Sequence, residues 1–301
     1  MSFLRSFKLC VAAAALSTVA HAAAVPDFAP HPAVGWIPLY SEFHSPPSGP
    51  GPVLQDPAHP RVTNAEFRRT GRQPTQPIAD LSNPILQPWV RDELRRHNAL
   101  ALSGQAAMSR TASCWPDGVP AFLLHPIRPY FFIQTPEKVL IIYEGDSEVR
   151  HIYLTDKHSE NVTPSWFGES IGRYEGDELV VDTVGISMKT FVDNYYTPHT
   201  ERMHVVERFR LLDGGNRLEA RVHVEDPGAF TTPWDAIQRF RRVEPGRADN
   251  NLPLGEVGSQ GLAAPLQELR REYVLLFRRS GRANPARRQT GFLTWRIASR
   301  E

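Results

Sequence analysis

The chain is poor in cysteine, with 2 in 301 residues. Cys10 lies in an N-terminal segment that we expect to be removed, which leaves Cys114 alone in the mature protein. A single thiol cannot form an intrachain disulfide, so the fold must be stabilised by its core. A lone exported cysteine is more often buried than catalytic, and we assign Cys114 no chemistry.

The chain also lacks an excess of charge of either sign. Its 34 basic and 33 acidic residues give a net charge of +1, so no global field draws it to nucleic acid or to anionic lipid. No metal signature, phosphate-binding loop or nucleophile motif is present. We therefore expect no cofactor, no bound metal, no nucleic-acid partner and no stable membrane insertion.

The first 24 residues have the features of a secretory signal peptide in the usual order. Basic Arg5 and Lys8 precede an apolar run over residues 9–15, and small residues surround Ala22. A run of this length is too short to span a bilayer stably. We expect residues 1–24 to be cleaved and the protein to be periplasmic or secreted; a membrane-anchoring first helix is the alternative.

Residues 25–85 are rich in proline, glycine, histidine and serine and show no sustained periodicity. We interpret them as an extended arm that wraps around the rest of the protein, although disorder explains the composition equally well. From Pro88 to Gly104, apolar residues recur near helical spacing. This pattern predicts one amphipathic helix, packed across the outside or one end of the body.

Beyond residue 129, alternating apolar and polar residues predict a mainly β fold. In residues 203–212, Met203, Val205, Phe209 and Leu211 fall on one face, and residues 218–224 alternate in the same way after a turn at 213–216. A period of two gives each strand one buried and one wet face, as in antiparallel sheet. The other expected strands are 130–134, 138–144, 148–154, 170–173, 179–183 and 234–243.

Short turns join successive strands without intervening helices, which predicts an antiparallel up-and-down meander. A meander this long must close into a barrel or fold into a sandwich to hide its edges, and we favour the β-barrel. The expected organisation is a signal peptide (1–24), an arm (25–85), a helix plus barrel (86–243) and a C-terminal extension (244–301). The extension is rich in arginine, has weak strand patterns at 272–277 and 291–297, and is interpreted as a solvated terminus.

Four motifs between Leu86 and Val243 resemble a widespread family of exported bacterial proteins that is itself uncharacterised. They are C-x-P-x-G-x-P from Cys114, Q-T-P from Gln134, W-x-G-x-S-I-G-x-[WY]-E-G-D-x-L-V-V-D-T-x-G from Trp166 and P-H-[ST]-E-x-x-H-V-x-E-R-F from Pro198. The resemblance covers roughly half of the chain and implies a fold similar to the calycin barrels. It lends no catalytic residues. The sequence departs from the family's pattern at residues 195–197, where a turn with glycine is more usual, and after Val243.

Glu207 is the first candidate for chemistry, because alternation places its carboxylate on the apolar face of its strand. Burial there would raise the pKa of the carboxyl group, as a general acid or base requires, unless a basic partner keeps it ionised. A structural ion pair with an arginine, or a hydrogen bond to a tyrosine or tryptophan, is the alternative.

A second group of candidates forms the pattern H-x-E-x-x-H, made of His199, Glu201 and His204. The spacing differs from the helical H-E-x-x-H metal motif, and a metal would need a bend and a further ligand such as Asp182 or Asp193. We favour a histidine that acts with a carboxylate in proton transfer over the metal; polar residues that cap a loop are the simplest alternative. We expect Asp182 either to point into the barrel or to accept backbone N–H groups from the turn at Gly185.

These assignments lead to one functional hypothesis. We expect an exported, cofactor-free acid/base enzyme, a hydrolase, lyase or isomerase, that acts on a small apolar or aromatic molecule in the barrel cavity. The expected catalytic residues are Glu207, His199, His204 and Asp182, and the expected substrate-binding residues are Tyr143, Tyr174, Met203 and Phe209. A periplasmic carrier that binds the same kind of ligand without catalysis is the alternative, and an envelope-assembly protein is a third. The substrate, the oligomeric state and whether His199, Glu201 and His204 bind a metal stay open.

Overall fold

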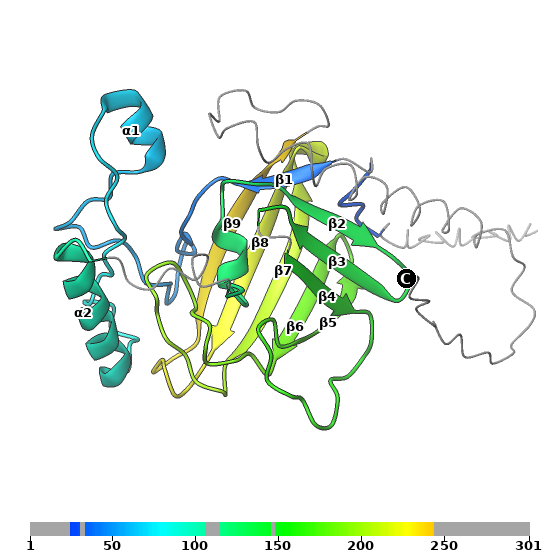
Figure 1. Ribbon diagram of the computed structural model, residues 1–301. Coiled ribbons are helices and arrows are strands. Elements are labelled where there is room, and N and C mark those ends of the chain that lie inside the picture. The colour runs from blue at the N-terminus through cyan, green and yellow to red at the C-terminus, as the bar shows by residue number, and fades with distance from the viewer. Residues whose placement is uncertain (1–24, 31–33, 106–114, 146–147, 244–301) are drawn as a thin grey trace, which may run out of the picture.

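The computed structural model describes residues 25–30, 34–105, 115–145 and 148–243, and in them a closed β-barrel (Figure 1). Its strands are β1 (Gly35–Pro38), β2 (Tyr130–Gln134), β3 (Lys138–Tyr143), β4 (Glu148–Tyr153), β5 (Glu169–Glu175), β6 (Glu178–Val184), β7 (His204–Leu212), β8 (Arg217–Glu225) and β9 (Trp234–Val243). The prediction of a mainly β barrel is confirmed. The expected signal peptide, Cys114 and the C-terminal extension lie outside the described residues.

The alternation in the sequence decides which side chains line the barrel. Val205, Glu207 and Phe209 of β7 are fully buried, and the residues between them are half-exposed. β8 and β9 follow in antiparallel register, with His204 opposite Glu225 in β7 and β8. Because side chains in a strand point alternately to opposite faces, every odd-numbered position of β7 from Val205 to Phe209 faces the barrel interior.

Aromatic rings fill much of the barrel interior. Tyr130 and Tyr143 stack with their ring centroids 4.7 Å apart, Phe122 meets Tyr130 edge-on at 5.1 Å, and Phe132 meets Phe209 at 5.8 Å. All five side chains are buried. Each such ring removes about 150–250 Å² from water, which at about 25 cal/mol per Å² is several kcal/mol, so these rings dominate the core. Phe122 belongs to the short 3₁₀ helix η2 (Ala121–Leu124), whose residues are all buried.

The N-terminal arm contributes a strand to the barrel. In β1, Gly35 to Pro38 pair with Val243 to Phe240 of β9, and Trp36 pairs with Tyr130 of β2. The indole Nε1 of Trp36 donates to the carbonyl oxygen of Phe28 at 2.8 Å. β1 therefore joins the last strand to the second and closes the barrel, a role that the sequence did not predict for a four-residue stretch among prolines.

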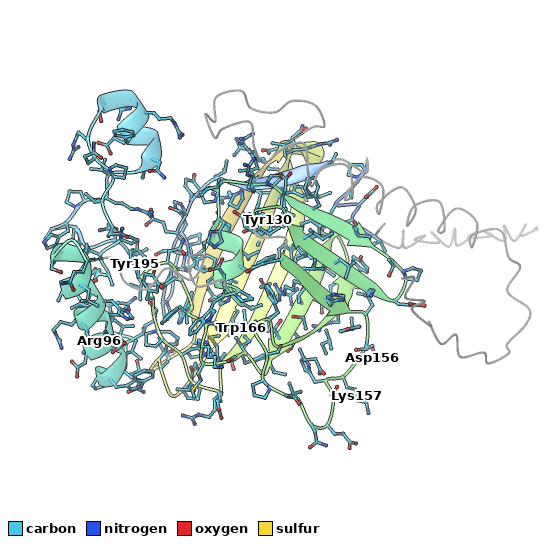
Figure 2. The ribbon with its side chains drawn as sticks, in the orientation of Figure 1. Arg96, Tyr130, Asp156, Lys157, Trp166 and Tyr195 are labelled. Carbon is cyan, nitrogen blue, oxygen red and sulfur yellow. The ribbon has the colours of Figure 1, made fainter. Side chains whose placement is uncertain are left out.

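The strand pairs of the barrel are antiparallel except for β4 with β5, in which Ile152 lies opposite Ser170 in parallel register. The expected meander is interrupted here because the connection over residues 154–168 is much longer than a hairpin turn. A parallel pair requires such a crossover. Figure 2 shows Asp156 and Lys157 of this connection at the lower right, beside the barrel.

The predicted helix is confirmed as α2 (Pro88–Leu102), with proline in its first turn and Val90 and Leu94 buried. Trp89 donates from its indole Nε1 to the carbonyl oxygen of Gly228 at 2.7 Å, which ties α2 to the loop between β8 and β9. Figure 1 places α2 beside the barrel, at the left.

The arm also contains a short helix that was not predicted, α1 (Asn64–Thr70). Thr63 caps it by accepting the Glu66 N–H at 3.1 Å, and Gly71 ends it with a φ of 76°. Among the described residues, no helix has the length and apolar character needed to cross a membrane.

Two glycines allow a matched test of the turns that flank β5. Gly168 has a φ of +63°, and a Cβ there would lie 2.4 Å from the carbonyl oxygen of Val184; Gly176 has a φ of +62° and open space around it. We expect Gly176→Ala to cost about 1–2 kcal/mol for its left-handed backbone. Gly168→Ala should cost at least about 1 kcal/mol more, because a backbone oxygen in a strand cannot move aside. Urea denaturation measures both losses, and equal losses would contradict this view of Gly168.

Candidate functional site

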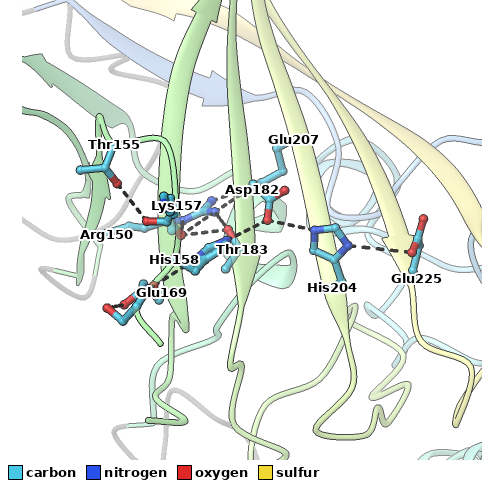
Figure 3. A network of polar contacts seen from close by, with 12 residues as sticks. Arg150, Thr155, Lys157, His158, Glu169, Asp182, Thr183, His204, Glu207 and Glu225 are labelled. Carbon is cyan, nitrogen blue, oxygen red and sulfur yellow. Dashed lines mark hydrogen bonds and ion pairs between the residues drawn. The ribbon is translucent and has the colours of Figure 1, made fainter. Parts of the chain in front are cut away.

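Glu207 lies inside the barrel and is held by Arg150 of β4 (Figure 3). Both side chains are fully buried. Arg150 donates from Nη1 to Oε1 of Glu207 at 2.9 Å and from Nη2 to Oε2 at 2.5 Å. Such a bidentate contact compensates the charge of the buried carboxylate. The geometry therefore favours the structural ion pair over proton transfer as the role of Glu207.

Two hydroxyl groups complete the surroundings of Arg150. Its Nη2 donates to Thr183 Oγ1 at 2.9 Å and to Ser170 Oγ at 3.2 Å, and its Nε donates to Ser170 Oγ at 3.3 Å. Adjacent strands β4, β5, β6 and β7 thus each contribute one buried polar side chain to one network. Arg150 was not predicted from the sequence, although alternation places it on the same face as buried Ile152.

Asp182 points out of the barrel, so the expectation that it points inward is wrong. Val181 and Thr183 take the interior positions of β6, opposite Glu207 and Val205 of β7, and Asp182 between them lies on the outer wall. Valines on both faces of β6 hid this parity, which is fixed by the pairing with β7. The carboxylate of Asp182 is held by the side chains of His158 and His204. The other expectation, that the turn at Gly185 would hold it, is therefore not met.

Two histidines meet the carboxylate of Asp182 on the outer wall (Figure 3). Nε2 of His204 and Nε2 of His158 each lie 2.9 Å from Oδ1 of Asp182. His158 comes from the connection between β4 and β5, and its Nδ1 lies 3.0 Å from Oε1 of Glu169. These four side chains are between 21% and 33% exposed, so solvent and small solutes reach them. We call Asp182, His158, His204 and Glu169 the outer-wall network.

The two carboxylates of the outer-wall network have lowered pKa values. Burial raises the pKa of Asp182, but the hydrogen bond from His158 and the charge and hydrogen bond of His204 outweigh burial. The pKa of Glu169 is lowered chiefly by hydrogen bonds from the hydroxyl and the backbone N–H of Ser159. Both groups are therefore ionised at neutral pH and hold the histidines as hydrogen-bond donors.

Among the described residues, none is recorded within hydrogen-bond distance of Nδ1 of His204. Its Nδ1 is 3.9 Å from Oε2 of Glu225, beyond hydrogen-bond distance, whereas both nitrogens of His158 lie against carboxylates. Half-buried apolar side chains occupy the outer-face positions next to Asp182 and His204; they are Ile171, Val184 and Val206. A small apolar molecule could lie on this floor with His204 Nδ1 at its edge.

The other members of the H-x-E-x-x-H pattern do not join this network. His199 is buried, with Nε2 2.9 Å from Thr190 Oγ1 and Nδ1 2.9 Å from the carbonyl oxygen of Thr200, and burial lowers its pKa. Glu201 is exposed on the loop before β7. In the described part of the chain, no group of three or more histidine, cysteine, aspartate or glutamate side chains is placed to hold a metal ion.

The predicted substrate-binding residues lie in or near the packed core. Tyr143, Met203 and Phe209 are buried, and Phe209 packs against Phe132. Tyr174 is half-buried, and its hydroxyl accepts a hydrogen bond from Gln134 Nε2 at 2.9 Å. The contacts of Phe209 and Tyr174 are on the interior side of the wall, whereas the outer-wall network lies on the opposite side. His158, which is in that network, was missed because it stands in a loop without periodicity, and only its carboxylate-rich neighbourhood could have indicated it.

Comparisons with protein-family models, with curated proteins and with solved structures found no match to this chain. The family resemblance noted in the sequence therefore stays a prediction. Because no residue role can be carried over from a relative, the function has to be inferred from the geometry of the site itself.

The buried ion pair can be tested by a double-mutant cycle. Arg150→Met or Glu207→Leu alone should lower the free energy of unfolding by about 3–5 kcal/mol, because each leaves a buried charge without its partner. The double variant should recover most of that loss, since neither charge remains. Urea denaturation of the four proteins gives the coupling energy. Additive losses would show that the two residues are independent.

The buried imidazole of His199 predicts a pH dependence of stability. Because the pKa of His199 is lowered in the folded protein, the unfolded chain takes up the proton first, and stability is lost as the pH falls below the ordinary histidine value of about 6.5. His199→Gln should therefore be less stable than wild type at neutral pH, by an amount that shrinks as the pH falls. Denaturation from pH 7.5 to about 4.5 measures this. A stability difference between wild type and His199→Gln that stays constant with pH would contradict this prediction. His59→Gln, at an exposed position, is the control.

Proposed function

We propose that the protein is an exported, cofactor-free acid/base enzyme and that its proton-transfer site is the outer-wall network. One observation carries the proposal: two imidazoles from different parts of the chain converge within 2.9 Å on one carboxylate oxygen of Asp182, at a place that solvent reaches. A carboxylate that orients a histidine is the usual arrangement of a general base.

Each residue of the network has a role in this proposal. Asp182 orients His204 through Nε2, which leaves Nδ1 to exchange a proton with the substrate. Glu169 fixes His158 from its other side, so that His158 presents a second positive charge to Asp182 when protonated. Ionised Asp182 stabilises the imidazolium that forms when His204 takes up a proton.

The substrate that fits this site is a small apolar or aromatic molecule. Ile171, Val184 and Val206 give the outer wall an apolar floor beside Asp182 and His204. The interior is less suited to the reaction, because the described core is filled with aromatic rings and Glu207 is compensated by Arg150. The carrier hypothesis, in contrast, places the ligand in a cavity inside the barrel.

Export is part of the proposal and rests on the sequence of residues 1–24. A basic start, a short apolar run and small residues before Ala24 are the features that signal peptidases recognise. The proposed enzyme therefore works in the periplasm or outside the cell, where it meets small molecules at the exposed barrel wall.

Proton exchange tests the proposal without knowledge of the net reaction. The purified protein is incubated in D₂O with a panel of small aromatic ketones and esters, and mass spectrometry detects deuterium incorporation next to the carbonyl group and ester hydrolysis. We expect at least one compound to react. His204→Gln and Asp182→Asn should each slow that reaction about 100-fold or more, the usual contribution of a positioned acid/base group.

The control is His59→Gln, which removes a histidine that contacts Asp56 at 2.7 Å on the exposed arm, a similar pair without a second imidazole. This variant should react like the wild type. The proposal is wrong if no compound in the panel reacts, or if His204→Gln reacts as fast as His59→Gln.

A further inference from the structure

A second polar cluster occupies the outer wall toward the other end of β7, β8 and β9. Its centre is Glu219 of β8, which lies in register with Arg210 of β7 and Arg239 of β9. Arg221, two residues along β8, points to the same side. The side chain of Glu219 is only 2% exposed, whereas those of Arg210, Arg221 and Arg239 are 29%, 50% and 44% exposed. The carboxylate therefore lies beneath three guanidinium groups.

The hydrogen bonds show which edge of each guanidinium group is used. Arg210 donates to Oε1 of Glu219 from Nε at 3.1 Å and from Nη2 at 2.7 Å. Arg221 donates from Nε to the same oxygen at 3.2 Å, and Arg239 donates from Nε to Oε2 at 2.9 Å. Each arginine is thus anchored through the Nε nearest to its own stem.

Most of the terminal Nη atoms of the three arginines are not used in binding Glu219. Arg221 and Arg239 have both Nη groups, and Arg210 has Nη1, without a hydrogen bond or ion pair to any other described residue. Three positive charges are set against one negative charge, so the cluster keeps an excess of positive charge at the surface. The neighbouring Arg208 differs, because Glu175 and Glu178 bind it.

We propose that Arg210, Arg221 and Arg239 form a binding site for the phosphate groups of an anionic ligand, with Glu219 as the residue that positions them. Free arginine side chains lose considerable rotamer freedom when they bind a ligand. Here Glu219 has already fixed the three stems, and the remaining Nη groups are donors of the kind that matches phosphate oxygens. The function assigned to the outer-wall network is not needed for this site.

The size of the cluster favours a phosphate or diphosphate over a single carboxylate. Strands in a sheet lie about 4.8 Å apart, so donors on β7, β8 and β9 span roughly 10 Å. A single carboxylate can bind the paired N–H donors of only one guanidinium group, whereas a diphosphate presents oxygens to all three guanidinium groups. Its two or more negative charges also match the excess positive charge of the cluster.

Pyrophosphate is the probe that tests this site, by isothermal titration calorimetry and by NMR of the arginine Nε–Hε groups. We expect saturable binding to one site per chain, with shifts at Arg210, Arg221 and Arg239. Arg221→Gln and Arg239→Gln should each weaken binding about tenfold or more, because each removes a charged donor. Arg173→Gln is the control: Arg173 is an exposed strand arginine that, among the described residues, forms an ion pair only with Glu175.

Glu219→Gln separates a positioned site from simple charge attraction. The substitution removes a negative charge, so attraction alone predicts tighter pyrophosphate binding. The proposed site predicts binding about tenfold weaker, because the guanidinium groups lose their anchor. Tighter binding by this variant, no saturable binding by the wild type, or an equal loss in Arg173→Gln would each overturn the proposal. Should Glu219→Gln fail to fold, Arg221→Gln against Arg173→Gln decides the question.

Discussion

The closed barrel imposes one constraint on which the rest of the structure depends: each strand residue faces either the interior or the outer wall. Once the parity of β7 is set, Glu207 must be inside and His204 and Arg210 outside. The pairing then carries the same choice to Thr183 and Asp182 of β6. The polar networks described above are consequences of this parity, because neighbouring residues of one strand end up on opposite sides of the wall.

The two sides of the wall demand different electrostatics. Inside, a carboxylate costs several kcal/mol unless a partner compensates it, and Glu207 meets that demand with the bidentate contact from Arg150. Outside, water solvates what the protein leaves unpaired. The outer wall therefore tolerates groups that no described residue pairs with, namely one imidazole nitrogen of His204 and the terminal guanidinium nitrogens of Arg221 and Arg239. Groups that are not fully paired are the ones that remain available to bind or to react.

The sequence predicted most of the fold because the strands after residue 129 alternate clearly. β2 and β9 begin and end as expected, and Glu207 lies on the predicted face. Prediction failed where the local sequence does not alternate clearly enough to show which side of the wall each residue faces. β1 is too short to alternate, and its place in the barrel is decided by its pairing with β9, far away in the sequence.

The candidate site was harder to predict than the fold for the same reason. Asp182 and His204 were recognised as candidates, but the face of Asp182 stayed open between two alternatives, because valines occur on both faces of β6. His158 and Arg150 reach their partners only through the barrel's closure and the long connection after β4. Contacts between distant segments leave no periodic trace in the sequence, so a network built from such contacts has to be found in the structure.

The two outer-wall sites share strand β7 but are not within reach of one small ligand. His204 and Arg210 are six residues apart on β7, which at about 3.3 Å per residue is roughly 20 Å. A single aromatic ring on the floor beside His204 cannot also place a phosphate on Arg210, so a one-ring substrate leaves the two sites independent. A molecule that used both would have to carry its phosphate groups on an extended stem along the barrel wall. The length of a ligand that competes at both sites would therefore reveal whether the wall holds one elongated binding surface or two separate ones.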